Sequence, residues 1–516
     1  YFMPSGENAA LLATLAGTSA GSLIASENGI FELNGQKYGF DVASIPNSVF
    51  EYAEGTKDDY NFTVQEADAE GNLTDKYYKI NLKPENFSTS KSITWTEVPE
   101  AQKDDKDDDL SDGKVSAVIA VRLPNDQTKY FQYTYTKPDG RIIYSTRQVN
   151  FTGDVIDADF IGNFLSANYP AGGAIYNTGI RNKINGNFIS NYLIGNGIQG
   201  GAIYNIGTIE NITGNFVGNY AASTGNFAYG GAIYNDRATI GSINANFADN
   251  YTSLGHSWGG GIANSGIISS IAGNFISNHT TSNGGAIFNG SIFDGPDVAI
   301  NNVYGDFINN YVASSSSGDD VASGGAIFNG SVFGGFSNVK IGSIIGDFIG
   351  NHVSSVIYSS YGGAIFNGTT KFDYTTSNGY ASLGDITGNF IANYAVSVND
   401  SAYGGAISNY GYAQYSSLGN ITGSFIKNYA VSDSKSAFGG AIYNGIKDKG
   451  SVALGYVSGN FLNNYVQTKS ITQLAYGGAV YTEGNMTFAA GEQKTYFMSG
   501  NYTLGRSYNK RYNAIF

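Results

Sequence analysis

Two short phrases of apolar and polar residues alternate through most of the chain. The first reads Gly-Gly-Ala-Ile-Tyr-Asn over residues 172–177, and the second reads Ile-Asn-Gly-Asn-Phe-Ile-Ser-Asn-Tyr over residues 184–192. Copies of the first phrase follow one another at intervals of 25 to 42 residues, and their ten first glycines are Gly172, Gly200, Gly230, Gly259, Gly284, Gly324, Gly362, Gly404, Gly439 and Gly477. Such self-similarity indicates an array of one supersecondary unit that stacks on its own copies.

Two positions of the first phrase are predicted to point into the interior. The fourth is aliphatic in every copy and the sixth is asparagine in nine, and residues two apart on a strand share a face. Stacked asparagines can pass amide hydrogen bonds along the array and satisfy turn carbonyls. The glycine pair before them predicts a corner with positive φ. These predicted ladders begin with Ile175, Ile203 and Ile233, and with Asn177, Asn205 and Asn235.

The fifth position of the first phrase is aromatic in eight copies and is Ala263 or Ser408 in the other two. This tolerance predicts an outward, partly exposed aromatic column, which begins with Tyr176, Tyr204 and Tyr234. An exposed column could stack on sugars, whereas the alternative is an aromatic ladder that packs on itself.

The second phrase carries a phenylalanine and, three residues later, an asparagine. The residue between Ile189 and Asn191 varies freely and includes Ser277 in a later copy, so it is predicted to face solvent. Ile189 and Asn191 then share the inner face. The invariant phenylalanine is also expected inside, which requires a corner or bulge between Phe188 and Ile189. The predicted ladders begin with Phe188 and Phe216, and with Asn191 and Asn219.

The phrases together predict an all-β fold whose main part is a parallel β-helix, a three-sided solenoid of about ten coils. Parallel crossovers are right-handed, and coils about 4.8 Å apart give a rod on the order of 50 Å long. The array is expected over residues 149–485, and a degraded coil or edge over 486–516. The longer repeats are expected to insert surface loops such as residues 314–320.

Residues 1–148 carry neither phrase and predict a smaller, sandwich-like β domain with a possible capping or assembly role. Its short alternating runs are typical of strands. These runs are 30–33, 77–82, 116–123, 130–135 and 141–144.

Composition limits the classes of function. The 516 residues have a net charge of −14, which disfavours nucleic acid as a partner, and the chain has no cysteine for disulfides or thiolate metal sites. No run of 18 apolar residues predicts a transmembrane helix. The charged fraction of 14% is well below the usual quarter, and 70 glycines is about twice the usual share, a composition that resembles β-solenoids. No cofactor is expected.

Few residues suggest site chemistry. Catalysis by a β-helix lyase or hydrolase needs paired carboxylates, for which Asp157 with Asp159 and Asp319 with Asp320 are the candidates, although neither pair recurs on neighbouring coils. His279 and His352 occupy a tyrosine position, and His256 stands alone. The acidic run contains Asp104, Asp105, Asp107, Asp108, Asp109 and Asp112. It could collect Ca²⁺ weakly or form a solvated loop.

The alternation of Gly-Gly-Ala-Ile with Phe-x-x-Asn over about residues 150–485 resembles the polymorphic outer membrane proteins of chlamydiae and related autotransporter passengers. The resemblance implies a right-handed parallel β-helix on the bacterial outer surface or secreted from it. It also implies a non-catalytic adhesin whose partner is a host-cell or glycan surface.

Two alternatives remain. The apolar stretch 9–24 and the strand-like end Ala514, Ile515 and Phe516 could meet between subunits, and the basic residues Arg506, Lys510 and Arg511 would favour an acidic N-terminal partner. The chain would then be a subunit of an extracellular filament or matrix that grows head to tail by strand addition. The second alternative is a β-helix polysaccharide lyase or hydrolase.

Overall fold

The computed structural model of the chain describes only the backbone of five strands among residues 1–89, and it describes residues 90–515 with short gaps. The gaps are 124–126, 146–150, 152, 226, 292–294, 316–320, 333–336, 371–379, 413–414, 448–449, 489–494, 498–500, 506–508 and 512–514. The predicted segment 9–24 and the pair Asp319 and Asp320 therefore lie outside the described residues.

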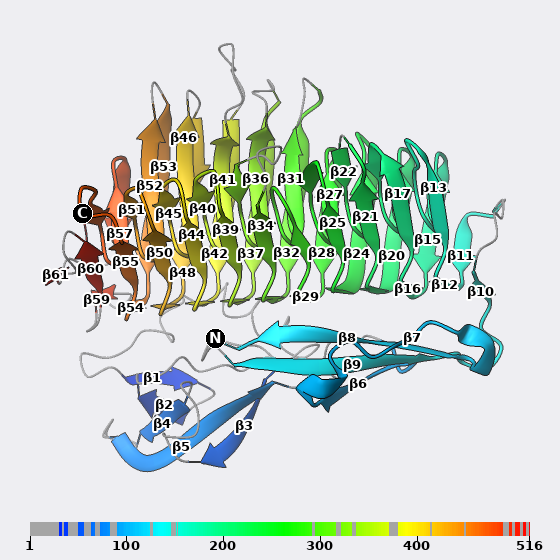
Figure 1. Ribbon diagram of the computed structural model, residues 1–516, viewed down its shortest axis with the longest axis horizontal. Helices are drawn as coiled ribbons and strands as arrows, with labels where there is room; N and C mark the ends of the chain where they lie inside the picture. Colours follow the sequence, from blue (N-terminus) through cyan, green and yellow to red (C-terminus); the bar gives the residue numbers. More distant parts are fainter. Residues whose placement is uncertain are drawn as a thin grey trace.

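The main body is the predicted parallel β-helix, and its coils stack along the long axis of the molecule (Figure 1). Three long sheets form its sides, here called sheets 1, 2 and 3. Sheet 3 consists of β14 (Ile175–Asn177), β19 (Ile203–Asn205), β23 (Ile233–Asn235), β27 (Ile262–Asn264), β31 (Ile287–Ser291), β36 (Ile327–Val332), β41 (Ile365–Thr370), β46 (Ile407–Tyr412), β52 (Ile442–Lys447) and β57 (Val480–Thr482).

Sheet 1 follows sheet 3 in each coil and bends once. It consists of β10 (Ile143–Tyr144), β11 (Val155–Asp157), β12 (Asp159–Ile161), β15 (Ile180–Asn185), β16 (Phe188–Ile189), β20 (Thr208–Val217), β24 (Thr239–Ala248), β28 (Ile267–Ala272), β29 (Phe275–Ile276), β32 (Val298–Tyr304), β33 (Phe307–Ile308), β37 (Val339–Ile345), β38 (Phe348–Ile349), β42 (Tyr380–Thr387), β43 (Phe390–Ile391), β47 (Tyr415–Leu418), β48 (Ile421–Thr422), β49 (Phe425–Ile426), β53 (Ser451–Ser458), β54 (Asn460–Leu462), β58 (Asn485–Phe488) and β59 (Tyr496–Phe497).

Sheet 2 consists of β13 (Phe164–Asn168), β17 (Tyr192–Asn196), β21 (Tyr220–Ser223), β25 (Tyr251–Ser253), β30 (His279–Thr280), β34 (Tyr311–Ser314), β39 (His352–Ser355), β44 (Tyr394–Ser397), β50 (Tyr429–Ser432), β55 (Tyr465–Thr468), β60 (Tyr502–Gly505) and β61 (Asn509–Arg511). Short corner strands join sheet 2 to sheet 3. They are β18 (Ile198–Gln199), β22 (Phe227–Tyr229), β26 (His256–Trp258), β35 (Ala322–Ser323), β40 (Ser360–Tyr361), β45 (Ala402–Tyr403), β51 (Ala437–Phe438) and β56 (Ala475–Tyr476).

The glycine pair makes the corner before sheet 3, as predicted. Gly324 has φ +65°, and a Cβ on it would lie 2.2 Å from the carbonyl oxygen of Ile327. A Cβ on Gly325 would lie 2.0 Å from the carbonyl oxygen of Gly363 in the next coil. The first glycine therefore supplies the left-handed turn, and the second lets adjacent coils approach.

The interior contains the predicted aliphatic and phenylalanine columns. The sheet 3 isoleucines pair in register, as Ile287 with Ile327 and Ile327 with Ile365, and are buried. The phenylalanines stack face to face, with centroids 4.6 Å apart for Phe188 and Phe216. Because every coil adds the same layer, each column buries apolar surface along the whole rod.

The corner of the second phrase is not where the sequence suggested. Phe188 packs in the interior, but Ile189 points outward, so plain alternation holds between them. The turn comes at Ser190, whose φ is +52°, and it returns Asn191 to the inside. The prediction of a corner between Phe188 and Ile189 is therefore wrong. Ile189 and its equivalents form an outward apolar strip on sheet 1, which consists of Ile161, Ile189, Val217, Ala248, Ile276, Ile308, Ile349, Ile391, Ile426 and Leu462.

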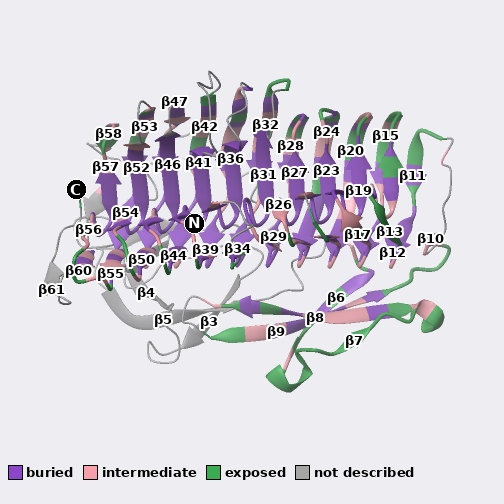
Figure 2. Ribbon diagram, turned by 45° about the horizontal axis from the view of Figure 1, so that its top comes forward, coloured by how far each residue is buried: buried purple, intermediate pink, exposed green. Residues whose placement is uncertain are grey.

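The N-terminal region covers this strip. A four-stranded antiparallel sheet of β6 (Ile93–Val98), β7 (Lys106–Asp107), β8 (Lys114–Arg122) and β9 (Thr128–Thr136) lies along the flank of the rod (Figures 1 and 2). Its side chains, such as Ile119 and Phe131, share one apolar core with the strip. The described chain before it forms a second sheet of β1 (Ile30–Leu33), β2 (Gln36–Gly39), β3 (Phe50–Gly55), β4 (Thr63–Ala67) and β5 (Leu73–Leu82).

This packing overturns the prediction that the residue between Ile189 and Asn191 faces solvent in every copy. Ser277 is only 4% exposed, and its hydroxyl donates to the carbonyl oxygen of Ala120 on β8 at 3.1 Å. Other members differ in what covers them: a Cβ on Gly218 would lie 3.4 Å from the Tyr133 hydroxyl of β9, whereas Asn463 is exposed.

The solenoid begins earlier than predicted. β10, expected in the N-terminal domain, pairs in parallel with β12, so the first coil starts at Ile143 rather than near residue 149. At the other end, β58, β59 and β60 continue sheets 1 and 2, so the stretch after residue 485 contains a further partial coil. Two short 3-10 helices, η4 (Glu100–Gln102) and η5 (Leu110–Asp112), connect strands of the N-terminal sheet.

Candidate functional site

Both predicted asparagine ladders are continuous hydrogen-bonded rows. In sheet 3, Nδ2 of Asn177 donates to Oδ1 of Asn205 at 2.8 Å, and Asn205 donates to Asn235 in the same way. In the other ladder, Nδ2 of Asn191 donates to Oδ1 of Asn219 at 2.9 Å. These side chains are buried and bonded to one another, so they hold coils together and offer nothing to a ligand.

The aromatic column of the first phrase is mostly covered. Tyr176 in the first copy is 54% exposed, but Tyr204 and Tyr234 are 7% and 6% exposed. The corner strands lay a second aromatic row over the column, and Tyr229, for example, stacks on Tyr234 with centroids 4.7 Å apart. The prediction of an exposed column is wrong beyond Tyr176.

The two non-aromatic copies have a packing explanation. Beside Ala263, the fully buried ring of Trp258 fills the space and contacts Phe288 at a centroid distance of 6.0 Å. In the copy with Ser408, Tyr410 joins the aromatic cluster, with its ring 5.0 Å from that of Tyr361. Tolerance at this position thus reflects compensation inside the cluster and not exposure.

The carboxylate pair Asp157 and Asp159 is tied to a single guanidinium. Nε of Arg141 donates to Oδ1 of Asp159 at 3.0 Å, and Nη1 of Arg141 donates to Asp157. Burial opposes ionisation of Asp157, but the hydrogen bonds from Arg141 and Asn185 and the Arg141 charge hold its pKa below its usual value. Asp159 is fully buried, and the Tyr135 hydroxyl also donates to it at 2.5 Å.

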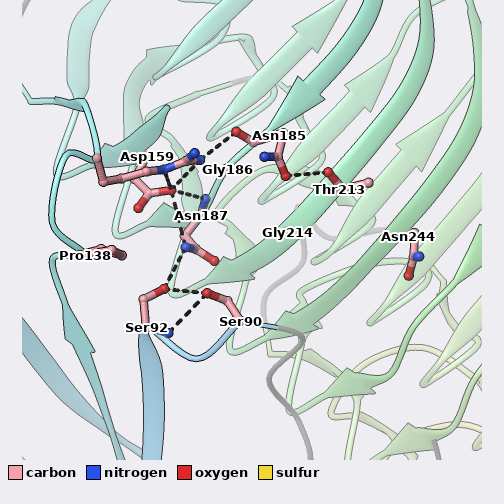
Figure 3. A pocket seen from close by; sticks show the side chains of 11 residues that line it. Ser90, Ser92, Pro138, Asp159, Asn185, Gly186, Asn187, Thr213, Gly214 and Asn244 are labelled. Atoms are coloured by element: carbon pink, nitrogen blue, oxygen red, sulfur yellow. Dashed lines mark hydrogen bonds and ion pairs between the residues drawn. The ribbon is translucent and has the colours of Figure 1, made fainter. Parts of the chain in front are cut away.

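A pocket of about 440 Å³ lies beside this pair, between the N-terminal sheet and the first coils (Figure 3). The backbone N–H of Asn187 donates to Oδ1 of Asp159 at 2.8 Å, and Nδ2 of Asn187 donates to the Ser92 hydroxyl at 3.2 Å. The Ser92 and Ser90 hydroxyls are also bonded to each other. The polar groups at this end of the pocket therefore fasten the N-terminal sheet to the two successive coils that contain β12 and β16.

The acidic run forms turns. Oδ1 of Asp109 accepts from the backbone N–H of Ser111 at 2.9 Å, and Oδ1 of Asp112 accepts from that of Lys114 at 2.8 Å. A hydrogen bond from Lys106 and its charge lower the pKa of Asp108. Across the described residues, no group of three or more His, Asp or Glu side chains is arranged to hold a metal ion, and no helix is long and apolar enough to cross a membrane.

A further aromatic row runs along the start of the sheet 2 strands, separate from the column of the first phrase and from the row on the corner strands that covers it. We call this further row the corner ladder. Neighbouring ring centroids are 4.6 to 5.3 Å apart and ring planes differ by 1° to 12°. Most members are half-buried. The corner ladder consists of Phe164, Tyr192, Tyr220, Tyr251, His279, Tyr311, His352, Tyr394, Tyr429, Tyr465 and Tyr502.

His279 and His352 stand in this ladder as tyrosine substitutes, as predicted. His279 stacks on Tyr251 and Tyr311 at 4.9 and 4.6 Å, and burial lowers the pKa of both histidines to about 4. His256 lies elsewhere, in corner strand β26, stacked on Phe227.

The histidines predict an acid-sensitive stability. An unfolded chain protonates histidine near pH 6.5, whereas the folded ladder resists protonation until about pH 4. The wild type should therefore lose stability as the pH falls from about 6.5 to 4, with no such loss above pH 7. A His279→Tyr/His352→Tyr variant should lack this loss. Its melting temperature relative to wild type, measured from pH 8 to pH 4, should rise only below about pH 6.5; a constant difference would contradict the assignment.

The predicted assembly residues are only partly described. Ile515 forms a parallel bridge with Val480 of β57, so it already lies on the sheet 3 edge, and it is 41% exposed. Ala514 and Phe516 lie outside the described residues, as does Arg506, while Lys510 and Arg511 belong to β61, which pairs antiparallel with β60. The head-to-tail contact stays a prediction.

Comparison with protein-family models, curated proteins and solved structures finds no match to this chain.

Proposed function

We propose that the chain is a non-catalytic extracellular protein of the bacterial cell surface, an adhesin-type β-helix like the passengers whose repeats it resembles. The observation that carries the proposal is the corner ladder, in which Tyr192, Tyr220 and their equivalents repeat one partly exposed surface on successive coils. A repeated surface on a stacked solenoid suits an extended or multivalent ligand, because many weak contacts add along one rod.

The state of the carboxylates favours binding over catalysis. A glycosidase needs one carboxylic acid and one free carboxylate on either side of its substrate. Asp157 and Asp159 instead share Arg141, and Asp159 also receives bonds from Tyr135 and Asn187. This arrangement serves as a structural lock between the N-terminal sheet and the first coil.

Binding and turnover assays on the purified chain test the proposal. We expect saturable binding to epithelial cells or to a glycan array, and no release of reducing or unsaturated sugar ends from polysaccharides. Turnover of a polysaccharide without binding to any surface would favour the enzyme alternative, and threads longer than one molecule in electron micrographs would favour the filament.

A further inference from the structure

A groove of about 350 Å³ opens where the β8–β9 hairpin ends on the flank of the rod. The hairpin supplies Arg122 and Leu123 to one wall. Sheet 2 and the preceding turns supply the other residues, which are Gly350, Ala392, Tyr394, Lys427, Tyr429, Asn463, Tyr465 and Tyr502. The groove therefore contains the last four rings of the corner ladder.

The stacking of these rings determines which of their atoms a ligand can contact. Tyr429 lies 4.8 Å from Tyr394 and 4.9 Å from Tyr465, with ring planes within 10° of parallel. Each face is covered by the next ring, so a ligand meets the ring edges and phenol hydroxyls. Hydroxyl groups thus recur at about the 4.8 Å spacing of stacked strands along the groove.

The charge of the groove is opposite to that of the whole chain. Nη1 of Arg122 donates to the Tyr394 hydroxyl at 2.6 Å, which holds the guanidinium at the hairpin end of the groove. Lys427 lies in the left-handed turn just before Tyr429. No carboxylate occurs among the described residues that line the groove. A chain of net charge −14 thus places two cations, and no carboxylate of a described lining residue, around this groove.

We propose that this groove binds a linear acidic polysaccharide, extended along the rod. The tyrosine hydroxyls would bond to sugar oxygens that recur at a similar interval in an extended β-linked hexose chain, and Arg122 and Lys427 would pair with its carboxylate or sulfate groups. The assignment rests on the proposed function and gives it a ligand class. Single-stranded nucleic acid fits less well, because its bases need free aromatic faces to stack on and these faces are covered.

The test is binding of the full chain, by calorimetry, to polymannuronate, heparan sulfate, a soluble neutral β-1,4-glucan and single-stranded RNA. We expect at least one acidic polysaccharide to bind at least tenfold more tightly than the neutral glucan and the RNA. Binding of polymannuronate alone would identify a carboxylate ligand, and binding of heparan sulfate alone a sulfate ligand. Preference for the glucan or for RNA would overturn the proposal.

Two variants and one control test whether the polysaccharide binds in this groove. Tyr429→Phe/Tyr465→Phe removes two hydroxyls and keeps the stacking, since Phe164 occupies the same ladder. Lys427→Asn introduces a residue found with the same left-handed φ at positions 309 and 463. We expect each to weaken binding at least fivefold. Tyr304→Phe, at an exposed tyrosine of sheet 1 outside both the corner ladder and the groove, should change affinity less than twofold.

Cell or array binding by the same variants separates the two proposals. If the groove variants keep full affinity for the acidic polymer, the groove assignment is wrong. It is also wrong if the wild type binds cells but no polymer. Neither result contradicts the adhesin proposal. Wild type that binds neither polymer nor any surface overturns both.

Discussion

Replacing Ile327 by aspartate is expected to unfold the middle coils of the solenoid. Ile327 is fully buried between Ile287 and Ile365, and an unpaired carboxylate in such a place costs several kcal/mol. A melting temperature lower by roughly 10 °C should result, or a chain too unstable to purify. Thermal unfolding followed by circular dichroism measures the effect.

The control places the same charge in the same coil on the exposed side. Lys340 on β37 is exposed, so Lys340→Asp should change the free energy of unfolding by less than about 0.5 kcal/mol. Ser277, which sequence alone suggested as a silent site, is unsuitable because β8 covers it. Equal melting shifts for Ile327→Asp and Lys340→Asp would show that the sheet 3 isoleucines do not point inward.

The second large effect is expected from Asn310→Leu, which removes one rung of the inner asparagine ladder. Oδ1 of Asn310 accepts from the backbone N–H and from Nδ2 of Asn278, both at 3.0 Å. Nδ2 of Asn310 donates to Oδ1 of Asn351 and to the carbonyl oxygen of Phe275, at 3.0 and 2.8 Å. Each buried group left without its partner costs about 1–3 kcal/mol, so we expect a total loss of at least roughly 3 kcal/mol.

Denaturant unfolding measures the total loss in the free energy of unfolding, and amide hydrogen exchange shows which coils lose stability. Exchange should accelerate at Asn278 and on the flanking coils before it does so at the ends of the rod. Asn309→Gly is the matched control in the same turn, because Asn309 has φ +54° and Gly218 and Gly350 fill the equivalent positions at φ +62° and +63°. A loss as large in Asn309→Gly would mean that the turn, and not the ladder, is the sensitive element.

The sequence predicted the parts of this fold that depend on one coil and its identical neighbours. The isoleucine column, the asparagine ladders and the glycine corner all follow from residue type and alternation, because the stacking partner of each residue is its own equivalent. The histidines of the corner ladder were placed by the same argument.

Predictions failed where the partner lies elsewhere in the chain. Phe188 and Ile189 are both apolar, and nothing local says that Ile189 faces a sheet formed about 60 residues earlier. Ser277 is polar and variable, yet Ala120 covers it. Alanine at position 263, in place of the usual aromatic residue, suggested that the position is exposed. The ring that compensates for it, Trp258, lies outside the phrase. The groove was missed for the same reason, since Arg122 belongs to the hairpin.

The position of the N-terminal sheet also bears on the order of folding. β6 to β9 precede every coil in the chain, and their apolar face can be completed only by coils that are synthesised later. The bonds from Tyr135 and Arg141 to Asp159 fix the first coil at one end of that face. Each later coil can then settle on a neighbour and on a surface already in place, so the loop to be closed stays short as the rod lengthens. We therefore expect this sheet to act as a template on which the coils assemble from the N-terminus onward.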